Sequence, residues 1–306
     1  MSTVESTTRP APYTDREIRL RISECPKLAS LNSVNKALSE LIRSEGSLNS
    51  QIAEIIRRDP SLSARLLRMV NSVYFGFSAT ISSIEEAVFF LGLRRIRELS
   101  MATPVIEEMQ ALKLPSEIVL PWKDLWAHSI GCAILTREIL SCINITVDDD
   151  TDYLAGLLNN VGKVVMAYAF PEELLKIAVT PMKDSNAVCA LERELIGWDH
   201  TQIGAFFLER HKVSEEIVSA VRFHHAPDRA PCHRLFAAGG QVADHLVRHG
   251  GIATGFESVM TPAPDSWQQL DGWHILFGAD GTESKLGRAS IANTLTRLPS
   301  MLNGLL

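Results

Sequence analysis

Apolar residues recur every three to four positions along most of this chain. That spacing places them on one face of an α-helix, whereas a half-buried strand needs alternate apolar and polar positions, and such stretches are almost absent. Capping residues, prolines and glycines separate the helical stretches. The pattern therefore predicts an all-α protein.

The first third of the chain is predicted to form a multi-helix N-terminal subdomain over residues 15–113, after a flexible lead of residues 1–14. Asp59 is the expected N-cap of a helix that has Pro60 at its first position. Ser83 and Glu86 have the spacing of a capping box, which starts a helix that ends before Gly92. The expected helices span residues 15–25, 32–44, 49–58, 60 onward, 84–91 and 93–109.

A joint at residues 114–116 opens a second helical subdomain, which we place at residues 114–250. Residues 251–306 form a C-terminal extension, in which residues 261–264 are a linker and residues 284–305 a helix that folds back onto the body. The expected helices of the second subdomain span residues 121–142, 153–158, 161–170, 172–179, 186–196, 201–211, 215–225 and 232–249.

Composition narrows the functional classes. The 306 residues are 46% hydrophobic and 22% charged, with a formal net charge of −6. No overall basic field is available to hold a phosphate backbone, so nucleic acid is disfavoured as a partner. No uncharged apolar stretch reaches 18 residues, so we expect no membrane segment and a cytoplasmic location. The five cysteines form no C-x-x-C pair and are interpreted as reduced core residues.

Three other motifs favour ordinary explanations. The stretch from Gly156 to Val164 lacks the spacing and the Ser or Thr of a phosphate-binding loop. No G-x-S-x-G turn presents a serine nucleophile. His245 and His249 have the i, i+4 spacing of a metal pair, but both precede Gly250, where a histidine complements the helix dipole.

Histidines on three predicted helices point into the core of the second subdomain. At 100° per residue, His128 and His200 share the apolar arcs of their helices, and at least one of His224 and His225 also faces inward. A buried imidazole needs partners for both nitrogens. The residues alone leave two alternatives open: satisfied core histidines, or ligands that converge on one site.

Two segments resemble the signature of the HDOD family, the bacterial signalling relatives of HD-domain metal-dependent phosphohydrolases. Residues 59–72 are similar to its D-P-x-L-x-x-x-L-L-x-x-x-N-S element, and residues 81–92 to the following I-x-S-I-x-x-A-x-x-x-L-G element. The similarity covers about residues 15–250, with HD-like motifs in order around His128, Gly156, His200 and His224. The resemblance implies an N-terminal multi-helix subdomain packed on an HD-like subdomain.

One departure from the HD pattern decides the expected chemistry. The His-Asp pair that binds metal in active HD hydrolases is replaced by Asn159 and Asn160. Neutral carboxamides are weak ligands, so we expect no metal, no cofactor and no catalytic residue. The amides can instead hydrogen-bond to the imidazoles, or one of them can end a helix in a left-handed conformation. The relic pocket comprises His128, Asn159, Asn160, His200, His224, His225 and Asp244.

The resemblance then implies a non-catalytic signal-transduction output or scaffold protein, a pseudoenzyme that acts by protein–protein interaction. We expect a signalling protein as its partner and a small nucleotide as the alternative ligand. Too few residues precede Asp15 for a receiver domain, so input is expected from a separate partner. The rival is a metal-dependent phosphohydrolase or cyclic-nucleotide phosphodiesterase with an atypical ligand set. It predicts a divalent transition metal that is lost in His128→Ala or His200→Ala.

Overall fold

The computed structural model describes residues 13–26, 49–58, 60–71, 80–143, 150–254, 256–263, 266–278 and 282–302. These residues form α-helices, two short 3-10 helices and connecting segments, and their only β pairing is a bridge between Met182 and Val259. The predicted all-α class is confirmed. The helix expected over residues 32–44, the cap at Asp59 and most of the expected lead lie outside the described residues.

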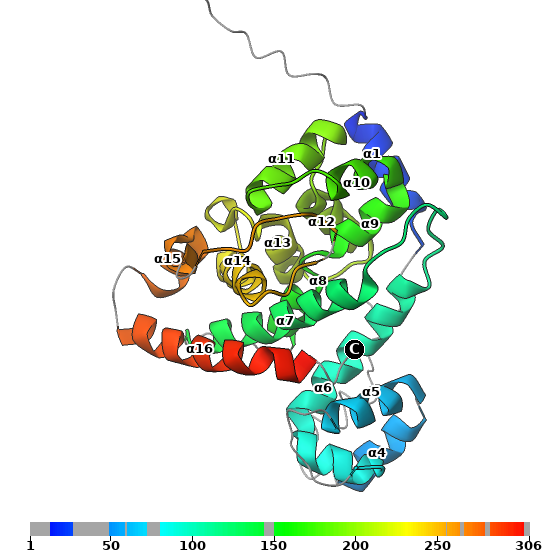
Figure 1. The fold of residues 1–306 in the computed structure, drawn as a ribbon, viewed down its shortest axis with the longest axis vertical. Helices are drawn as coiled ribbons and strands as arrows, with labels where there is room; N and C mark the ends of the chain where they lie inside the picture. The colour runs from blue at the N-terminus through cyan, green and yellow to red at the C-terminus, as the bar shows by residue number, and fades with distance from the viewer. Residues whose placement is uncertain are drawn as a thin grey trace, which may run out of the picture.

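A small unit consists of α4 (Asn49–Arg57), α5 (Pro60–Val70) and the first part of α6 (Ile84–Gln110). Figure 1 shows it at one end of the molecule, with α6 running from it into the rest. The hydroxyl of Ser83 accepts a hydrogen bond from the backbone N–H of Glu86, as the sequence predicts. Gly92 interrupts α6 with a φ of 74°, where one helix was expected to end and another to begin.

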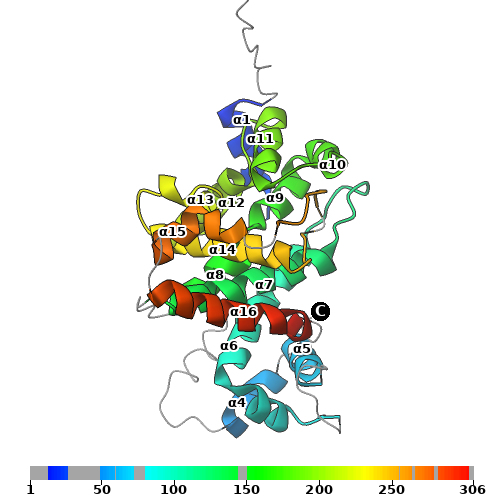
Figure 2. The ribbon, with the colours of Figure 1, turned by 60° about the vertical axis from the view of Figure 1, so that its left-hand side comes forward.

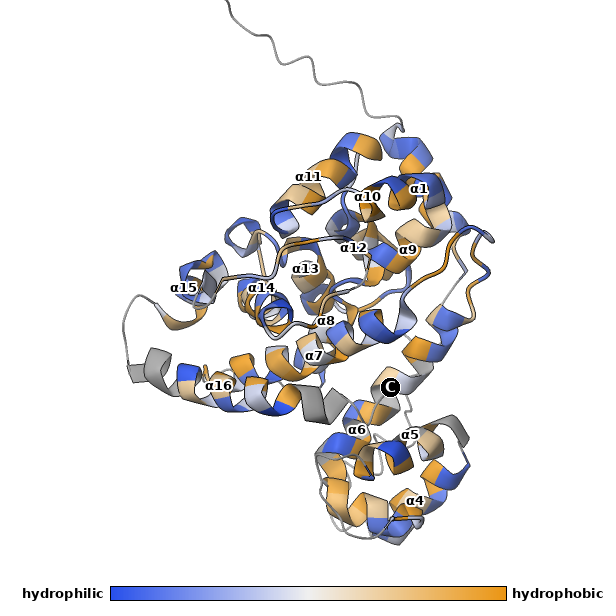
Figure 3. Ribbon diagram, in the orientation of Figure 1, coloured by the Kyte–Doolittle hydropathy of each residue, from blue (hydrophilic) through white to orange (hydrophobic). Residues whose placement is uncertain are grey.

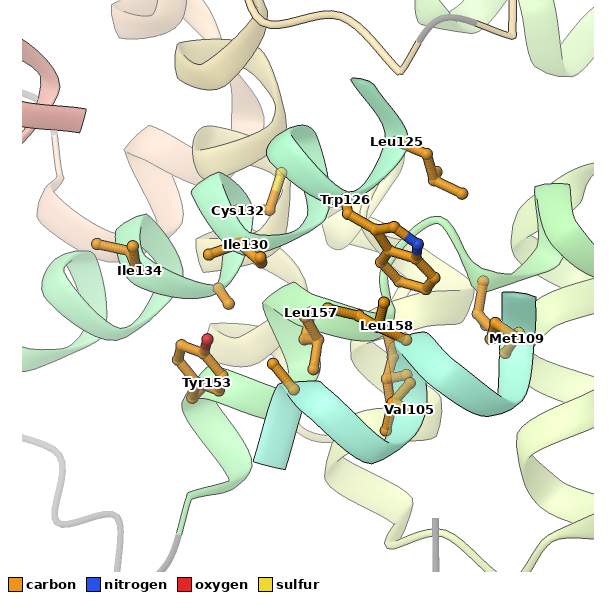
Figure 4. Close-up of a cluster of buried hydrophobic side chains, with 14 of the residues drawn as sticks. Val105, Met109, Leu125, Trp126, Ile130, Cys132, Ile134, Tyr153, Leu157 and Leu158 are labelled. Carbon is orange, nitrogen blue, oxygen red and sulfur yellow. The ribbon is translucent and has the colours of Figure 1, made fainter. Parts of the chain in front are cut away.

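The second part of α6 joins this unit to the remaining helices. Figure 4 shows Val105 and Met109 of α6 close to Trp126 of α7 (Trp122–Ser141) and Leu158 of α8 (Thr151–Leu158). All four side chains are buried. Each contributes on the order of 1.5–3 kcal/mol by its burial. The two units therefore share a continuous apolar core.

The second unit is built around α7, which packs on α8 and on α14 (Arg234–His249). A side chain at Gly156 would place its Cβ 2.5 Å from the carbonyl oxygen of Cys132, so glycine permits the close contact between α8 and α7. Figure 3 shows hydrophobic and hydrophilic residues alternating along these helices, as amphipathic packing requires. The other elements are α9 (Val161–Ala169), α10 (Pro171–Ala178), α11 (Ser185–Leu195), α12 (His200–Arg210), α13 (Glu215–Phe223) and η1 (Pro227–Arg229).

The first helix, α1 (Asp15–Glu24), packs on the second unit, although the sequence groups it with the first. It contacts α9 and α12, and Figure 1 shows it beside α10 and α11. Arg19 lies over the ring of Trp198, and Arg21 donates a hydrogen bond to the carbonyl oxygen of Ala169. These contacts attach α1 to the second unit, away from α4 and α5.

The C-terminal extension folds back onto the body, as predicted. Both ribbon views show α16 (Thr282–Leu302) lying along α7, and its Ile291 and Leu298 are buried. The expected linker differs, because residues 256–263 pack against the second unit and the backbone N–H of Met182 donates to the carbonyl of Ser258. Two further elements, η2 (Ser266–Gln269) and α15 (Asp271–Phe277), were not predicted.

Two predicted helix boundaries near the site need correction. The α13 helix ends at Phe223 instead of residue 225, and the chain then turns into η1. The α14 helix begins at Arg234 instead of residue 232, after His233 in a left-handed conformation with a φ of 52°. The capping residues at these two boundaries, His224 and His233, are polar, so apolar periodicity does not mark either boundary.

None of the described helices is both long enough and apolar enough to cross a membrane.

Candidate functional site

The seven residues predicted for the site come from five segments that the fold brings together. These segments are the first half of α7, the junction of α8 and α9, the start of α12, the end of α13 and the second half of α14. All seven side chains are buried except that of His225, which is half-buried. The residues are His128, Asn159, Asn160, His200, His224, His225 and Asp244.

Both nitrogens of the His128 ring face oxygen atoms. Nδ1 lies 2.8 Å from the carbonyl oxygen of Ile252, and Nε2 lies 2.9 Å from Oδ1 of Asp244. Each nitrogen must carry a hydrogen to donate to an oxygen, so both bonds form together only in the imidazolium form. His128 thus links Asp244 to the backbone at Ile252 inside the protein.

Protein donors occupy both oxygens of the Asp244 carboxylate. Arg248 donates from Nε to Oδ2 over 3.1 Å, while His128 and Asn160 approach Oδ1. Burial raises the pKa of Asp244, but the charge of Arg248 and the hydrogen bond from His128 outweigh burial and hold this pKa well below its usual range. The carboxylate is therefore anionic, and its charge is already neutralised by side chains.

The two carboxamides lie between α8 and α9 and are almost completely buried. Asn160 donates from Nδ2 to Oδ1 of Asn159 over 3.1 Å and approaches Oδ1 of Asp244 at 3.4 Å. The expected hydrogen bonds to imidazoles are not among the contacts of Asn159 and Asn160, because the donor of Asn160 points to the carboxylate. The left-handed alternative is wrong, since both residues have negative φ angles of −54° and −103°.

The remaining histidines form a second cluster. His200 Nδ1 lies 2.7 Å from Oε2 of Glu192, and its Nε2 lies 3.2 Å from Nε2 of His225. His224 donates from Nδ1 to the carbonyl of Val221 over 2.8 Å. Burial, followed by the charge of His200, lowers the pKa of His224 to about 4, and burial with the charge of His224 lowers the pKa of His225 well below its usual range. His224 and His225 are therefore neutral near neutral pH.

Glu192 was missed by the sequence reading. It lies on α11 four residues after Val188 and four before Ile196, all three of them buried. A carboxylate on an apolar stripe of this kind is a signal for a buried charged partner, because an unpaired carboxylate is costly to bury. The signal names no partner by itself.

A buried group of charges next to the site was also missed. Lys163 of α9 donates to Oε1 of Glu257 over 2.5 Å, and Arg248 donates to the same oxygen over 3.0 Å. Thr254 donates to Oε2 of Glu257. Burial raises the pKa of Glu257, but the charges of Lys163 and Arg248 outweigh it and hold this pKa well below its usual range. Lys163 within an apolar run was the available sequence signal.

An open pocket of about 470 Å³ gives access to one wall of the site. His225, Asp244 and Arg248 of the site line it. Residues 183–186, at and just before the start of α11, and residues 259–263 of the C-terminal extension also line it. The pocket volume is within the range of small-molecule sites.

His245 and His249 face separate oxygen atoms. His245 Nε2 lies 2.8 Å from Oγ of Ser266, and His249 Nδ1 lies 3.2 Å from the carbonyl oxygen of Pro262. Both are half-buried, instead of exposed as the dipole interpretation expected. These bonds tie α14 to the C-terminal extension, and the pair does not converge on one point.

The divalent metal implied by the HD resemblance does not fit the residues around Asp244. The side chains of His128, Cys132 and Asp244 have ligand atoms within 4.8 Å of one another. However, His128 and Arg248 already engage the two carboxylate oxygens, and Nδ2 of Asn160 lies 3.4 Å from Oδ1. A cation there would face hydrogens in place of lone pairs.

The sequence of this chain matches a known protein family. A model of the HDOD domain matches residues 28–227, which is more than half of the chain. The protein belongs to the HDOD family. Asp244, Arg248 and Glu257 lie beyond the matched residues, so the charged side of the site comes from a part of the chain that the family model does not cover.

Several known proteins are similar to this chain. An HDOD domain protein from Geobacter sulfurreducens is 20% identical with a TM-score of 0.71, covering 95% of this chain and 97% of its own. A proposed phosphohydrolase from Shewanella amazonensis SB2B is 22% identical with a TM-score of 0.64, covering 95% and 98%. At these identities the likeness shows the fold alone.

Among curated sequences, an uncharacterized protein from Treponema pallidum (strain Nichols) is 27% identical over 166 residues. The match covers 54% of this chain and 31% of that protein, so the chain spans about a third of the length of this relative.

Proposed function

We propose that this protein is a non-catalytic signal-transduction module that acts by binding a protein partner. The observation that carries the proposal is the contact of Asn160 with Asp244, in which a carboxamide donor meets the carboxylate that also pairs with His128. Membership of the HDOD family supports a signalling role.

The chemistry around Asp244 argues against hydrolysis. Hydrolases of this kind need a metal ion to make water nucleophilic near neutral pH. Here two neutral amides occupy the expected ligand positions, and Arg248 supplies a positive charge beside the carboxylate that His128 also contacts. The contacts around Asp244 are made within the chain, although Asn159 Nδ2 and Asn160 Oδ1 are buried without a hydrogen-bond partner, and we infer that binding is the means of action.

The small unit offers a surface suited to a partner. Phe89 is 69% exposed and Leu93 is 38% exposed on α6, close to the break at Gly92. Large exposed apolar side chains that lie close together mark interaction sites more often than scattered ones do. A signalling protein that buries this part of α6 would gain the hydrophobic free energy of both side chains.

The test combines a hydrolysis assay with a binding assay. Purified protein is incubated with phosphomonoester, phosphodiester and cyclic-nucleotide substrates, with Mn²⁺, Fe²⁺ or Zn²⁺ added in turn, and we expect no turnover above the protein-free control. Partner capture from the source cell should fall in Phe89→Ser and persist in the exposed control Val119→Ser. Turnover that disappears in His128→Ala would instead make the protein a metal-dependent phosphohydrolase or phosphodiesterase.

A second candidate function is sensing of a small nucleotide, which the open pocket beside Asp244 and Arg248 favours. Its lining includes Lys183 and Arg248, which pair with the lining carboxylates of Asp184 and Asp244. Ser185 and Gln241 add hydrogen-bonding groups. A nucleotide that binds only the folded state raises the melting temperature with its concentration and leaves no product. Thermal unfolding with a panel of nucleotides, followed by chromatography of the same samples, measures both.

A further inference from the structure

Three potential metal ligands outside the Asp244 network converge from three segments. Cys189 lies on α11, His200 is the first residue of α12, and His225 follows α13. The sulfur of Cys189 and a ring nitrogen of each histidine all lie within 4.8 Å of one another. The described part of the chain has one other such group, the His128 group, whose atoms the protein already engages.

The spacing of the two histidines matches that of two ligands on one ion. Nε2 of His200 and Nε2 of His225 are 3.2 Å apart. In a tetrahedral zinc site with bonds of about 2.0–2.1 Å, two nitrogen ligands lie about 3.3 Å apart. The thiol sulfur lies within 4.8 Å of a ring nitrogen of each histidine. A sulfur–nitrogen edge is about 3.6 Å in such a site, so the sulfur has to approach by no more than about 1.2 Å.

Glu192 holds His200 in the orientation of a metal ligand. Its Oε2 lies 2.7 Å from Nδ1 of His200 and also accepts the backbone N–H of the same residue over 2.9 Å. The hydrogen is thereby placed on Nδ1, so the lone pair of the neutral ring is on Nε2, facing His225. A carboxylate behind a histidine is the usual outer support of a zinc ligand.

The donor set selects the class of ion. One sulfur and two imidazole nitrogens suit zinc, whereas magnesium and calcium require oxygen ligands. One thiolate and the Glu192 carboxylate together balance the two positive charges of the ion, and Cys189 and His200 are buried to 3% and 1% exposure. A buried site with balanced charge avoids the cost of an unpaired ion.

We propose that Cys189, His200 and His225 bind one zinc ion. Binding forms the bond between sulfur and zinc and releases the thiol proton of Cys189 to solvent. The ion ties the end of α13 to α11 and α12, and the fourth coordination position belongs to a water molecule or a ligand from the pocket, which His225 also lines. This site does not rest on the proposed function, because it uses neither Asn159 nor Asn160.

The experiment measures metal directly in the full chain. Protein purified without chelators is analysed for zinc by mass spectrometry, and we expect about one zinc per chain. Metal-free protein titrated with Co²⁺ should show an absorption band from thiolate-to-cobalt charge transfer. The band reports a Co–S bond in the unmodified chain, so it does not depend on whether a variant folds.

Matched variants then assign the ligands. Cys189→Ser should abolish the cobalt band, His225→Ala should weaken zinc binding at least 10-fold, and Glu192→Gln should weaken it about 10–100-fold. Cys132→Ser and His128→Ala are the controls, because they alter the neighbouring group and should leave both readouts unchanged. Circular dichroism verifies that each variant is folded.

Three outcomes would overturn the proposal: no cobalt band in the unmodified chain, a band that persists in folded Cys189→Ser, or metal that is lost in His128→Ala and kept in His225→Ala. Zinc bound without turnover leaves the proposed function standing. Turnover in protein that shows no sulfur-to-cobalt band would contradict both proposals. Turnover in protein that shows the band would contradict the proposed function alone.

Discussion

Nδ2 of Asn160 lies 3.4 Å from Oδ1 of Asp244, the same carboxylate oxygen that His128 approaches at 2.9 Å. A hydrogen-bond donor thus stands where a metal-binding site would need a ligand oxygen. Through His128 and Asn160, Asp244 of α14 is joined to α7 and to the α8–α9 junction. Arg248, also on α14, engages the other carboxylate oxygen. The carboxylate therefore links three segments of the second unit.

Restoring the HD pair should create metal affinity at a cost to the metal-free protein. In Asn159→His with Asn160→Asp, a second carboxylate faces Asp244, and its oxygen has no hydrogen to donate. We expect the free energy of unfolding in chelator to fall by about 1–3 kcal/mol, the cost of an unsatisfied buried polar group. Added Mn²⁺ or Zn²⁺ should restore it, although hydrolysis need not follow.

The control for the restored pair is Asn186→Asp, which makes the same change at an exposed position of the pocket wall. It should leave the unfolding free energy and its metal dependence unchanged within about 0.5 kcal/mol. If the double variant were as stable as the parent in chelator and bound no more metal, Asn159 and Asn160 would not face a former metal position.

Glu257 should be among the most important polar residues for stability. It is the shared partner of Lys163 and Arg248, so Glu257→Gln leaves two buried cations with their common anion removed. Loss of one partner from a buried ion pair costs about 3–5 kcal/mol. Urea unfolding measures the loss, and Glu194→Gln on the exposed side of α11 is the control with no expected change. A loss below about 1 kcal/mol would show that the cluster contributes little.

The same residue gives a pH dependence with a defined sign. The folded-state pKa of Glu257 is below its ordinary value of 4.5, because Lys163 and Arg248 favour the carboxylate. Its stabilisation is therefore complete above that ordinary value and declines as the pH falls below it. Unfolding free energies of the parent and Glu257→Gln should differ most at neutral pH, and the difference should narrow steadily as the pH falls from 4.5 toward the lowered folded-state pKa. A gap that stays constant with pH would contradict the ion-pair account.

Much of the fold could be predicted because each helix buries one face, and that face leaves a period of three to four in the sequence. The long α7 helix was expected at residues 121–142 and spans Trp122–Ser141. Short elements escape this reasoning. The seven residues of α15 make two turns, too few for a period to stand out from a loop.

The site was predictable only in part, for the same physical reason. Inward-facing positions of His128 and His200 follow from their own helices. The partners that other segments contribute cannot be predicted in this way. In the sequence Cys189 is an ordinary core cysteine, and only the packing of α11 on α12 brings it to His200. Glu257 is a further case, because its partners Lys163 and Arg248 lie 94 and 9 residues away and nothing local pairs them.

The signature residue Asn71 should matter for stability of the small unit. Its side chain donates to the carbonyl oxygen of Ile81 and accepts from the N–H of Ile81, each over 2.7 Å. Asn71→Ala removes both bonds and leaves a half-buried backbone unpaired, so we expect a loss of about 1–3 kcal/mol. Asn293→Ala on the exposed face of α16 is the matched control. Chemical denaturation monitored by circular dichroism measures both.

An equal effect of the two asparagine changes would show that the bonds between Asn71 and Ile81 contribute little to stability. Asn71→Asp gives a finer comparison. It keeps the acceptor for the N–H of Ile81 and loses the donor, so its effect should lie between those of the parent and Asn71→Ala.

Gly162 allows α9 to lie close to His200. Replacing it should therefore disturb the site, although Gly162 has no side chain in it. A Cβ at this position would lie 1.9 Å from the carbonyl oxygen of His200, so Gly162→Ala forces α9 and α12 apart. We expect a loss of about 1–3 kcal/mol from overpacking and, if the zinc proposal holds, weaker cobalt binding as His200 moves. Gly250→Ala is the control, with a φ of −70° and its nearest neighbour at 3.4 Å. Thermal unfolding and the cobalt titration read out both effects, and an unchanged Gly162→Ala protein would mean that the two helices are free to separate without cost.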